Sequence, residues 1–563
     1  MKSNLLRKKD ISTLQLELDN VHAGSGMRKV LTVKDLTFMG VAAVIGAGIF
    51  STIGTAAYNG GPGVIFLFIL TAITCGFTAL CYAEFASRVP IAGSAYTYSY
   101  VTFGEQVAWI IGWALILEYS IGNIVVAISW SAYCNNLLEA FGVHLPDWLT
   151  IGYQTARKTY DAAVAAGQDT HHLVYTNAPV VAGLHIVMNL PAFLIIAFVT
   201  LLAYMGISES KKSANLMVGL KLVVLAFIAI IGFWIIFTEK KFANWTPFLP
   251  NGVSGVLQGV SSVFFAYIGF DAISTTAEEC ANPKRDLPRG MIYSLIICTI
   301  IYVVTTLVIT GLVNYSQFKG VADPLAFVFE QINMGKIGFL ISVSAVIAST
   351  SVLLVFQIGQ PRIWMSMSRD GLLPKKFGKL DRRRFTPGFA TIVTGLLVGI
   401  PSLFIDDLLM TDLTSIGTLF AFVLVCGGVL LLPSIEKKTG FHLPYINSRW
   451  IVSVLVLCFL LLFRQRIAGS IGHLETEGLQ NILFLVFSAI AIFIAILCFV
   501  KKLSLIPVLG MLCCLYLMIE IPMNSWIVFF GWMLAGLIIY FLYGKRHSLI
   551  GIGKNVTGKT IDK

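Results

Sequence analysis

The sequence predicts an all-α polytopic membrane protein, and three observations support that fold class. First, 57% of the 563 residues are apolar and only 12% are charged, about half the charged share of ordinary soluble domains. Second, the apolar residues form long unalternated runs, which favour helices over strands. Third, basic residues gather in alternate loops between these runs. Because lipid offers the backbone no hydrogen-bond partners, runs of this kind must cross it as helices.

Fourteen apolar runs are long enough to cross a bilayer. They lie near residues 36–57, 63–84, 106–132, 180–203, 214–237, 254–278, 291–313, 337–359, 388–404, 413–434, 450–464, 480–500, 503–520 and 525–543.

The basic residues alternate in number from one loop to the next. The N-terminus and every second loop carry 31 of the 40 Lys and Arg, the opposite loops carry 8, and Lys221 lies inside a span. This asymmetry predicts that both termini are cytoplasmic, in a multi-pass protein of the plasma (inner) membrane. The net charge of +11 is therefore interpreted as an orientation signal with affinity for anionic lipids on the cytoplasmic side, and not as a nucleic-acid surface.

The spans predict one membrane domain with an added C-terminal bundle. Residues 1–34 form a cytoplasmic N-terminal segment, 35–436 a transport core of ten spans, 437–545 four accessory spans and 546–563 a cytoplasmic tail. The longest polar interval, 135–179, is poor in Lys and Arg and is expected outside.

Two spans are interrupted by small residues. The first contains Ile45-Gly46-Ala47-Gly48, and the sixth contains Phe264-Phe265-Ala266-Tyr267-Ile268-Gly269. Glycine costs about 1 kcal/mol in a helix interior relative to alanine, so these positions invite unwinding. Weak points five spans apart, in spans of opposite direction, are typical of an inverted-repeat transporter with a midplane site. The alternative is that these glycines are close-packing points between helices.

At these residues the chain resembles a known family. It is similar to the amino acid–polyamine–organocation superfamily, and within it to the cationic amino acid transporter family with fourteen spans. The segments that carry the resemblance are Val44 to Phe50, Tyr82 to Pro90, Gly93 to Glu105, Ile116 to Gly122, Asn215 to Leu222, Phe264 to Asp271, Glu278 to Arg289, Gln360 to Pro374 and Trp526 to Ser548. The resemblance implies a five-plus-five inverted-repeat core and amino acid transport, by proton-coupled symport or by exchange.

An amino acid substrate needs a site for its carboxylate and another for its ammonium group. A broken helix supplies both, as freed N–H groups at one half-helix end and freed carbonyls at the other. The residues expected to bind the substrate are therefore Ile45, Gly46, Ala47 and Gly48 of the first break, with Ala266, Ile268 and Gly269 of the second. The resemblance adds an aromatic lid, Phe264 or Phe265, although either one suits an ordinary core position equally well.

Lys221 is the single residue that points most strongly to a functional site. It lies nine residues beyond Lys212, or about 13 Å into the ~30 Å hydrocarbon core. An ionised lysine at the centre of a membrane costs ~3 kcal/mol, so it needs partners or a task. The resemblance implies that it takes the place of a sodium ion and bridges the first break to span eight, near Ser349, Thr350 or Ser351. We expect a role in proton coupling, and the alternative is a permanently charged structural lysine.

Glu118 lies at a similar depth in the third span, about 18 Å along the helix from Gln106. It is a second candidate for proton movement, or for recognition of a cationic side chain. The alternative is a structural, hydrogen-bonded glutamate.

No cofactor or metal is expected, because the cysteines lie mostly inside apolar runs and no paired metal-ligand spacing is present. No nucleophile, phosphate loop or nucleotide fingerprint points to an enzyme. The expected function is an amino acid permease for cationic or small neutral L-amino acids, working by alternating access. An exchanger of amino acids or polyamines, a channel, and a non-transporting sensor are the alternatives. Whether a small single-span membrane partner exists stays open.

Overall fold

A computed structural model describes residues 7–9, 29–46, 48–89, 91, 93–321, 323–381, 384–405, 407–432, 441–472 and 479–549. This part of the chain is nearly all helical, and its one sheet is a two-stranded hairpin of β1 (Val180–Val181) and β2 (Leu184–His185). Nine of its helices are long and apolar enough to cross a membrane, and four shorter apolar helices accompany them. The predicted helical membrane protein is confirmed, whereas the count of fourteen spans and the five-plus-five repeat stay predictions.

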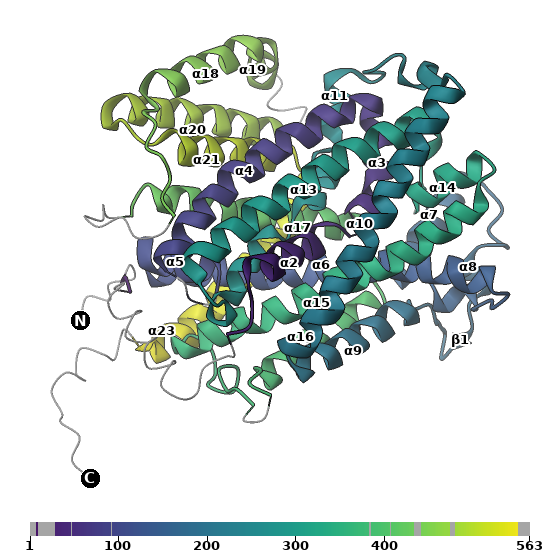
Figure 1. Cartoon of the computed structure of the whole chain (residues 1–563), viewed down its shortest axis with the longest axis horizontal. Coiled ribbons are helices and arrows are strands. Elements are labelled where there is room, and N and C mark those ends of the chain that lie inside the picture. The colour runs from purple at the N-terminus through teal and green to yellow at the C-terminus, as the bar shows by residue number, and fades with distance from the viewer. Residues whose placement is uncertain are drawn as a thin grey trace.

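Long tilted helices form the centre of the molecule (Figure 1). They are α4 (Val64–Arg88), α6 (Glu105–Ala140), α10 (Ile207–Thr238), α13 (Pro283–Leu312), α15 (Gly335–Arg369) and α17 (Asp407–Val429). In the most apolar stretch of each helix, 94% of α6 is buried inside the protein, against 39% of α10. A helix that is apolar on all sides belongs in the middle of a bundle. Helix α6 therefore lies in the middle of the bundle, where it packs on α15 and α17. Helix α10 lies at the edge of the bundle, with one face toward lipid.

Short helices sit inside this frame. They are α2 (Val33–Val44), α3 (Ile53–Gly60), α5 (Ala95–Thr102), α9 (Leu190–Met205), α11 (Gly252–Gln258), α12 (Val260–Tyr267), α14 (Pro324–Gln331) and α16 (Gly388–Ser402). Helix α2 begins at a capping box, in which the Thr32 backbone N–H and hydroxyl donate to the Asp35 carboxylate at 3.0 and 2.7 Å. It packs on α10, α13 and α15.

The long polar interval folds as a small unit at one end of the bundle. It contains α7 (Tyr153–Ala165) and α8 (Val174–Asn177), which lie at the opposite end from α23 (Lys545–His547) in Figure 1. The β1–β2 hairpin packs with them through the stacked rings of Tyr175 and His185, so the helix of the predicted fourth span, 180–203, begins only at Leu190. Its own small core contains Ala156 and Tyr175. The Gln154 N–H donates to Phe404 O at 2.9 Å, and this bond ties the unit to the connection between α16 and α17.

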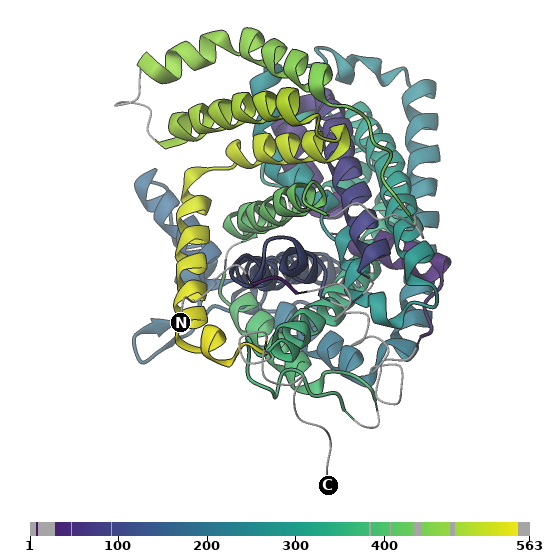
Figure 2. The same ribbon diagram turned by 90° about the vertical axis from the view of Figure 1, so that its left-hand side faces the viewer.

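The C-terminal helices form a separate layer. They are α18 (Arg449–Leu462), α19 (Arg464–Gly472), α20 (Leu479–Lys501), α21 (Leu505–Ile519) and α22 (Met523–Ile539), and Figure 2 shows the α18–α21 group stacked to one side of the central bundle. Phe484 and Phe487 belong to an apolar core of this group. Helix α21 joins it to α4 and α17. The predicted domain boundary at 436/437 falls outside the described residues, as do most of 1–34 and of 546–563.

Candidate functional site

The first span is interrupted where the sequence predicts. Helix α2 ends at Val44, and Ile45 leaves it in an extended conformation, with φ −81° and ψ 94°. The chain resumes as a wide helical turn from Gly48 to Thr52 before α3 begins. Ala47 lies outside the described residues. The Ile45 carbonyl is therefore released from helical bonding at mid-span.

The sixth span is interrupted as well. Helix α12 ends at Tyr267, Ile268 is extended with φ −62° and ψ 139°, and a 3₁₀ segment follows from Phe270 to Glu279. Gly269 adopts φ 114°, a backbone conformation that favours glycine. A Cβ added there would also lie 2.8 Å from Ala43 Cβ, so the second break is seated against the first span.

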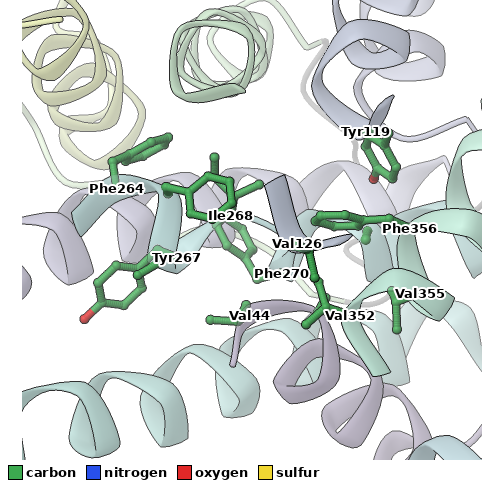
Figure 3. Packing of buried hydrophobic residues seen from close by; sticks show 14 of the residues in the cluster. Val44, Tyr119, Val126, Phe264, Tyr267, Ile268, Phe270, Val352, Val355 and Phe356 are labelled. Carbon is green, nitrogen blue, oxygen red and sulfur yellow. The ribbon is translucent and has the colours of Figure 1, made fainter. Parts of the chain in front are cut away.

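The two breaks touch each other. A Cβ on Gly48 would lie 2.4 Å from Ala266 Cα, and one on Gly46 would lie 2.3 Å from Val352 Cγ2. These two glycines therefore permit a close approach that any side chain would prevent. Figure 3 shows the apolar side chains gathered there from several elements, with Val352 next to Val44.

Tyr302 of α13 joins the broken ends. Its hydroxyl lies 2.6 Å from Val44 O and 2.6 Å from Ala266 O, and the ring is fully buried. The single hydroxyl proton is shared between two carbonyls, one from each break. Tyr302 was not predicted as a site residue, although a tyrosine in the middle of an apolar run needs a partner for its hydroxyl and so carried a usable signal.

Lys221 of α10 reaches the first break. Its Nζ donates to Ile45 O at 2.6 Å, Ala42 O at 3.2 Å and Ser351 Oγ at 3.0 Å, and its side chain is wholly buried. The ammonium group thus uses all three of its N–H bonds. It connects the end of α2 with α15.

The three candidate partners in α15 have different surroundings. Only Ser351 contacts Lys221, and its hydroxyl donates onward to Ala348 O at 2.6 Å. Thr350 accepts instead from Trp130 Nε1 at 2.9 Å. The Ser349 hydroxyl is buried and has no hydrogen-bond partner in the part of the chain that the structure describes.

Of the two aromatic candidates for a lid, Phe264 packs edge-on against Phe422 of α17, with ring centroids 6.0 Å apart. Figure 3 shows it on the opposite side of α12 from Tyr267. Phe265 is also buried, and its carbonyl accepts from the Ile268 N–H at 3.2 Å. Neither ring is distinguished as a lid by these contacts.

Comparison with known proteins identifies the family. The amino acid permease family model matches residues 31–466, and a model for the C-terminus of these permeases matches residues 503–548. The chain belongs to the amino acid permease family. It is 37% identical to the branched-chain amino acid permease BcaP of Bacillus subtilis, over 97% of this chain and 99% of that protein.

Other relatives of the permease carry different substrate names. A methylthioribose transporter of Bacillus subtilis is 33% identical over 97% of this chain and 99% of its own length. The vacuolar cationic amino acid transporter 2 of Arabidopsis thaliana is 37% identical over 76% of this chain and 63% of its own length. The permease is therefore a transporter and not an enzyme, and its resemblance to the cationic amino acid transporters is confirmed.

Glu118 of the permease is buried in α6, and its Oε2 has no hydrogen-bond partner among the described residues. The neighbouring Tyr119 donates to Asp271 Oδ2 at 3.4 Å, and Oδ1 of that aspartate is likewise buried without a partner. Two carboxylates with unused acceptor atoms thus lie beside the second break.

The second half of the first span, from Gly48 onward, is held by hydroxyl groups that were not predicted. The Tyr133 hydroxyl donates to Phe50 O. Thr52 Oγ1 lies 3.0 Å from Gly48 O and 3.1 Å from Ser262 O, which links the first span to α12. Hydroxyls beside an unwound helix replace the backbone bonds that it has lost.

Ion pairs close the opposite end of the sixth span. Glu279 Oε1 lies 2.5 Å from Arg362 Nη2, and Glu278 Oε1 lies 3.0 Å from Arg369 Nη1. Both arginines belong to α15. The Leu31 N–H also donates to Glu279 O at 3.0 Å, so the start of the first span, the sixth span and α15 are fastened together.

Proposed function

We propose that this permease takes up small neutral or cationic L-amino acids together with protons, by alternating access. The observation that carries the proposal is the Lys221 ammonium group, which spans the gap between the first break and α15. The breaks offer hydrogen-bond partners to the amino group and the carboxylate of the substrate. Because Lys221 contacts the first break, the geometry of that break depends on whether the lysine is protonated.

The proton dependence follows from counting donors. An ammonium group has three N–H bonds, and Lys221 faces three acceptors, Ala42 O, Ile45 O and Ser351 Oγ. A neutral amine has only two N–H bonds and a lone pair. Loss of the proton therefore leaves one acceptor without a donor and weakens the link between α2 and α15. A two-state contact of this kind can bias the exchange between conformations.

The freed backbone groups support an amino acid as the substrate. Carbonyls at the ends of α2 and α12 suit the α-ammonium group, and the N–H groups of the turn beginning at Gly48 suit the carboxylate. The side chains gathered beside the breaks, such as Ile268, Val352 and Phe356, are apolar (Figure 3). They favour a neutral substrate, as does the similarity to permeases named for branched-chain amino acids.

Glu118 favours a second possibility, a cationic substrate. Its Oε2 is buried with no hydrogen-bond partner within the described ranges of the chain, and relatives named for cationic amino acids belong to the same family. Uptake of lysine and of alanine by Glu118→Gln separates the two. Loss of lysine uptake alone assigns the glutamate to recognition, and equal loss of both rejects that role.

Proton coupling is tested with Lys221→Met in proteoliposomes under an imposed pH gradient. We expect accumulation against the substrate gradient to disappear, while exchange of substrate between loaded compartments persists. Lys319→Met, at an exposed position outside the spans, is the matched control and should accumulate substrate like the original protein. Unchanged pH-driven accumulation by the Lys221 variant contradicts the proposal.

An obligate exchanger is the alternative mode, and empty vesicles distinguish it. A symporter fills vesicles that contain no substrate, whereas an exchanger needs substrate inside. A sensor on the same scaffold binds its amino acid in a thermal-shift screen and moves none. The proposal further includes a five-plus-five repeat, both termini in the cytoplasm and residence in the cell membrane, supported by the alternation of basic residues.

A further inference from the structure

A pocket outside the substrate region opens at the end of the bundle that carries α23. Its volume is about 450 Å³, within the usual range for small-ligand sites. It lies between the loop that follows α15 and the C-terminal helix α23. These two segments are neighbours in Figure 1. Its lining residues are Ser368, Arg369, Gly371, Leu373, Lys375, Gly378, Lys379, Tyr543, His547 and Leu549.

The walls of the pocket are fixed by backbone contacts. Gly371 adopts φ 81°, and a Cβ there would lie 2.3 Å from His547 O. The Leu549 N–H donates to Asp370 O at 3.1 Å, and Ser368 Oγ donates to Pro374 O at 2.8 Å. The two sides of the pocket are therefore joined to each other, and its shape does not depend on exposed side chains alone.

The lining is strongly cationic. It contains two lysines, an arginine and a histidine, and no carboxylate. Arg369 is already paired with Glu278 at 3.0 Å. Lys375 and Lys379 have no ion-pair partner within the part of the chain that the structure describes. Two positive charges on one pocket thus stay uncompensated.

The carboxylate of Asp370, beside the pocket residue Arg369 in the chain, is already used elsewhere. Asp370 follows Arg369 in the chain, but its Oδ1 accepts from Lys9 at 2.7 Å and its Oδ2 accepts from the Tyr96 hydroxyl at 2.7 Å. The carboxylate is therefore held toward the N-terminal segment and α5. It does not neutralise the lysines.

An apolar surface continues from the rim of the pocket. Leu549 is 52% exposed, and Phe541 and Leu542, in the helical turn Tyr540–Gly544 that follows α22, are 44% and 65% exposed. A membrane protein leaves such side chains bare where acyl chains cover them. The pocket thus combines a basic cleft with a path for lipid tails, which is the arrangement that holds anionic headgroups.

We infer that this pocket binds a phosphate-bearing anion, with Lys375 and Lys379 as the charged contacts. The apolar rim favours a phospholipid headgroup as its source, and a soluble phosphate compound offers the same chemistry. The inference does not depend on the transport mechanism, because its charged contacts, Lys375 and Lys379, lie in the loop that follows α15 and not in either helix break.

The test uses the full-length protein in detergent, with binding measured by microscale thermophoresis. The probes are dioctanoyl phosphatidylglycerol and sn-glycerol 3-phosphate. The test variant is Lys375→Gln/Lys379→Gln. The control, Lys501→Gln/Lys502→Gln, removes the same charge from the exposed end of α20. Each lysine near a bilayer surface contributes on the order of a fivefold change in affinity, so we expect roughly 30-fold weaker lipid binding by the test variant and unchanged binding by the control.

The two sources give different results. If glycerol 3-phosphate does not displace the lipid, the ligand is a lipid headgroup. If it binds with similar affinity and the test variant loses it, the ligand is a soluble phosphate compound. Equal binding by both variants, or no binding of either probe to the original protein, overturns the inference.

Discussion

Gly48→Ala tests the close approach of the two helix breaks. The added methyl carbon would lie 2.4 Å from Ala266 Cα, 2.6 Å from its Cβ and 3.3 Å from its N atom. Favourable carbon contacts lie at about 3.5–4.0 Å, so the methyl is more than an ångström too close. The Cα and N atoms that the methyl meets belong to the backbone of Ala266, so they cannot rotate away as the end of a side chain could.

The size of the effect follows from this geometry. Inserting a methyl into a packed interior costs about 1–3 kcal/mol, and a rigid neighbour puts Gly48→Ala at the upper end. A cost of about 3 kcal/mol shifts the equilibrium constant between packed and unpacked breaks by roughly 150-fold toward the unpacked state. We expect a lower melting temperature and a substrate uptake rate reduced by up to that factor.

Gly46→Ala is the matched control. Its methyl would meet Val352 Cγ2 at 2.3 Å, which is a side-chain atom that can be removed. The single variant should therefore be impaired, whereas Gly46→Ala/Val352→Ala adds one methyl carbon and removes both γ-carbons of Val352, so the clash disappears and uptake should recover. Melting temperature and initial uptake rate in proteoliposomes are measured for all three. Original stability and uptake in Gly48→Ala would refute the packing of the breaks.

Three further predictions concern other contacts. Tyr302→Phe removes the hydroxyl that two buried carbonyls, Val44 O and Ala266 O, share, and should cost about 1–3 kcal/mol. The melting temperature and the uptake rate should both fall; unchanged values would show that the shared hydroxyl is dispensable. Burial, with Glu330 nearby, raises the pKa of Asp323 to about 6, while the Asn136 amide lowers it. The fold therefore favours the protonated form, so its stabilising effect is complete below about pH 4 and is lost as the pH rises through 6. After correction for the intrinsic pH dependence of amide exchange, the protection of α14 should fall over that range, and Asp323→Asn should keep the protection constant; an equal loss of protection in the variant argues against this role of Asp323. Glu279→Leu leaves the buried Arg362 charge without its partner and should lower the free energy of unfolding by about 3–5 kcal/mol. The double variant Glu279→Leu/Arg362→Leu should be nearly as stable as the original protein in thermal unfolding; an equal loss of stability in both variants would mean that the pair is not coupled.

Local composition was enough to predict where the spans are interrupted. Two glycines in three residues, and a glycine before Phe270, weaken a helix whatever surrounds it. The structure accordingly breaks after Val44 and after Tyr267. The depth of Lys221 follows equally from the fixed rise of a helix. These features depend only on residues that are close together in the sequence, so the sequence alone is enough to predict them.

The partners across the bundle could not be derived in this way. Successive residues of a helix point about 100° apart, so only one of Ser349, Thr350 and Ser351 can face a given neighbour. Which one does so depends on the rotation of α15 against α6 and α10. Tyr302 was missed for the same reason, because its two acceptors lie 36 and 258 positions away along the chain.

The sequence by itself determined a helical membrane protein, the places where two spans unwind and the position of one lysine deep within an apolar span, since hydropathy and helix geometry act locally. Tertiary packing decided that Lys221 meets Ile45 and Ser351, that Tyr302 joins both breaks, and that a basic pocket forms beside α23. Those contacts join segments far apart in the chain, and helix rotation and side-chain packing, which no single segment encodes, set them.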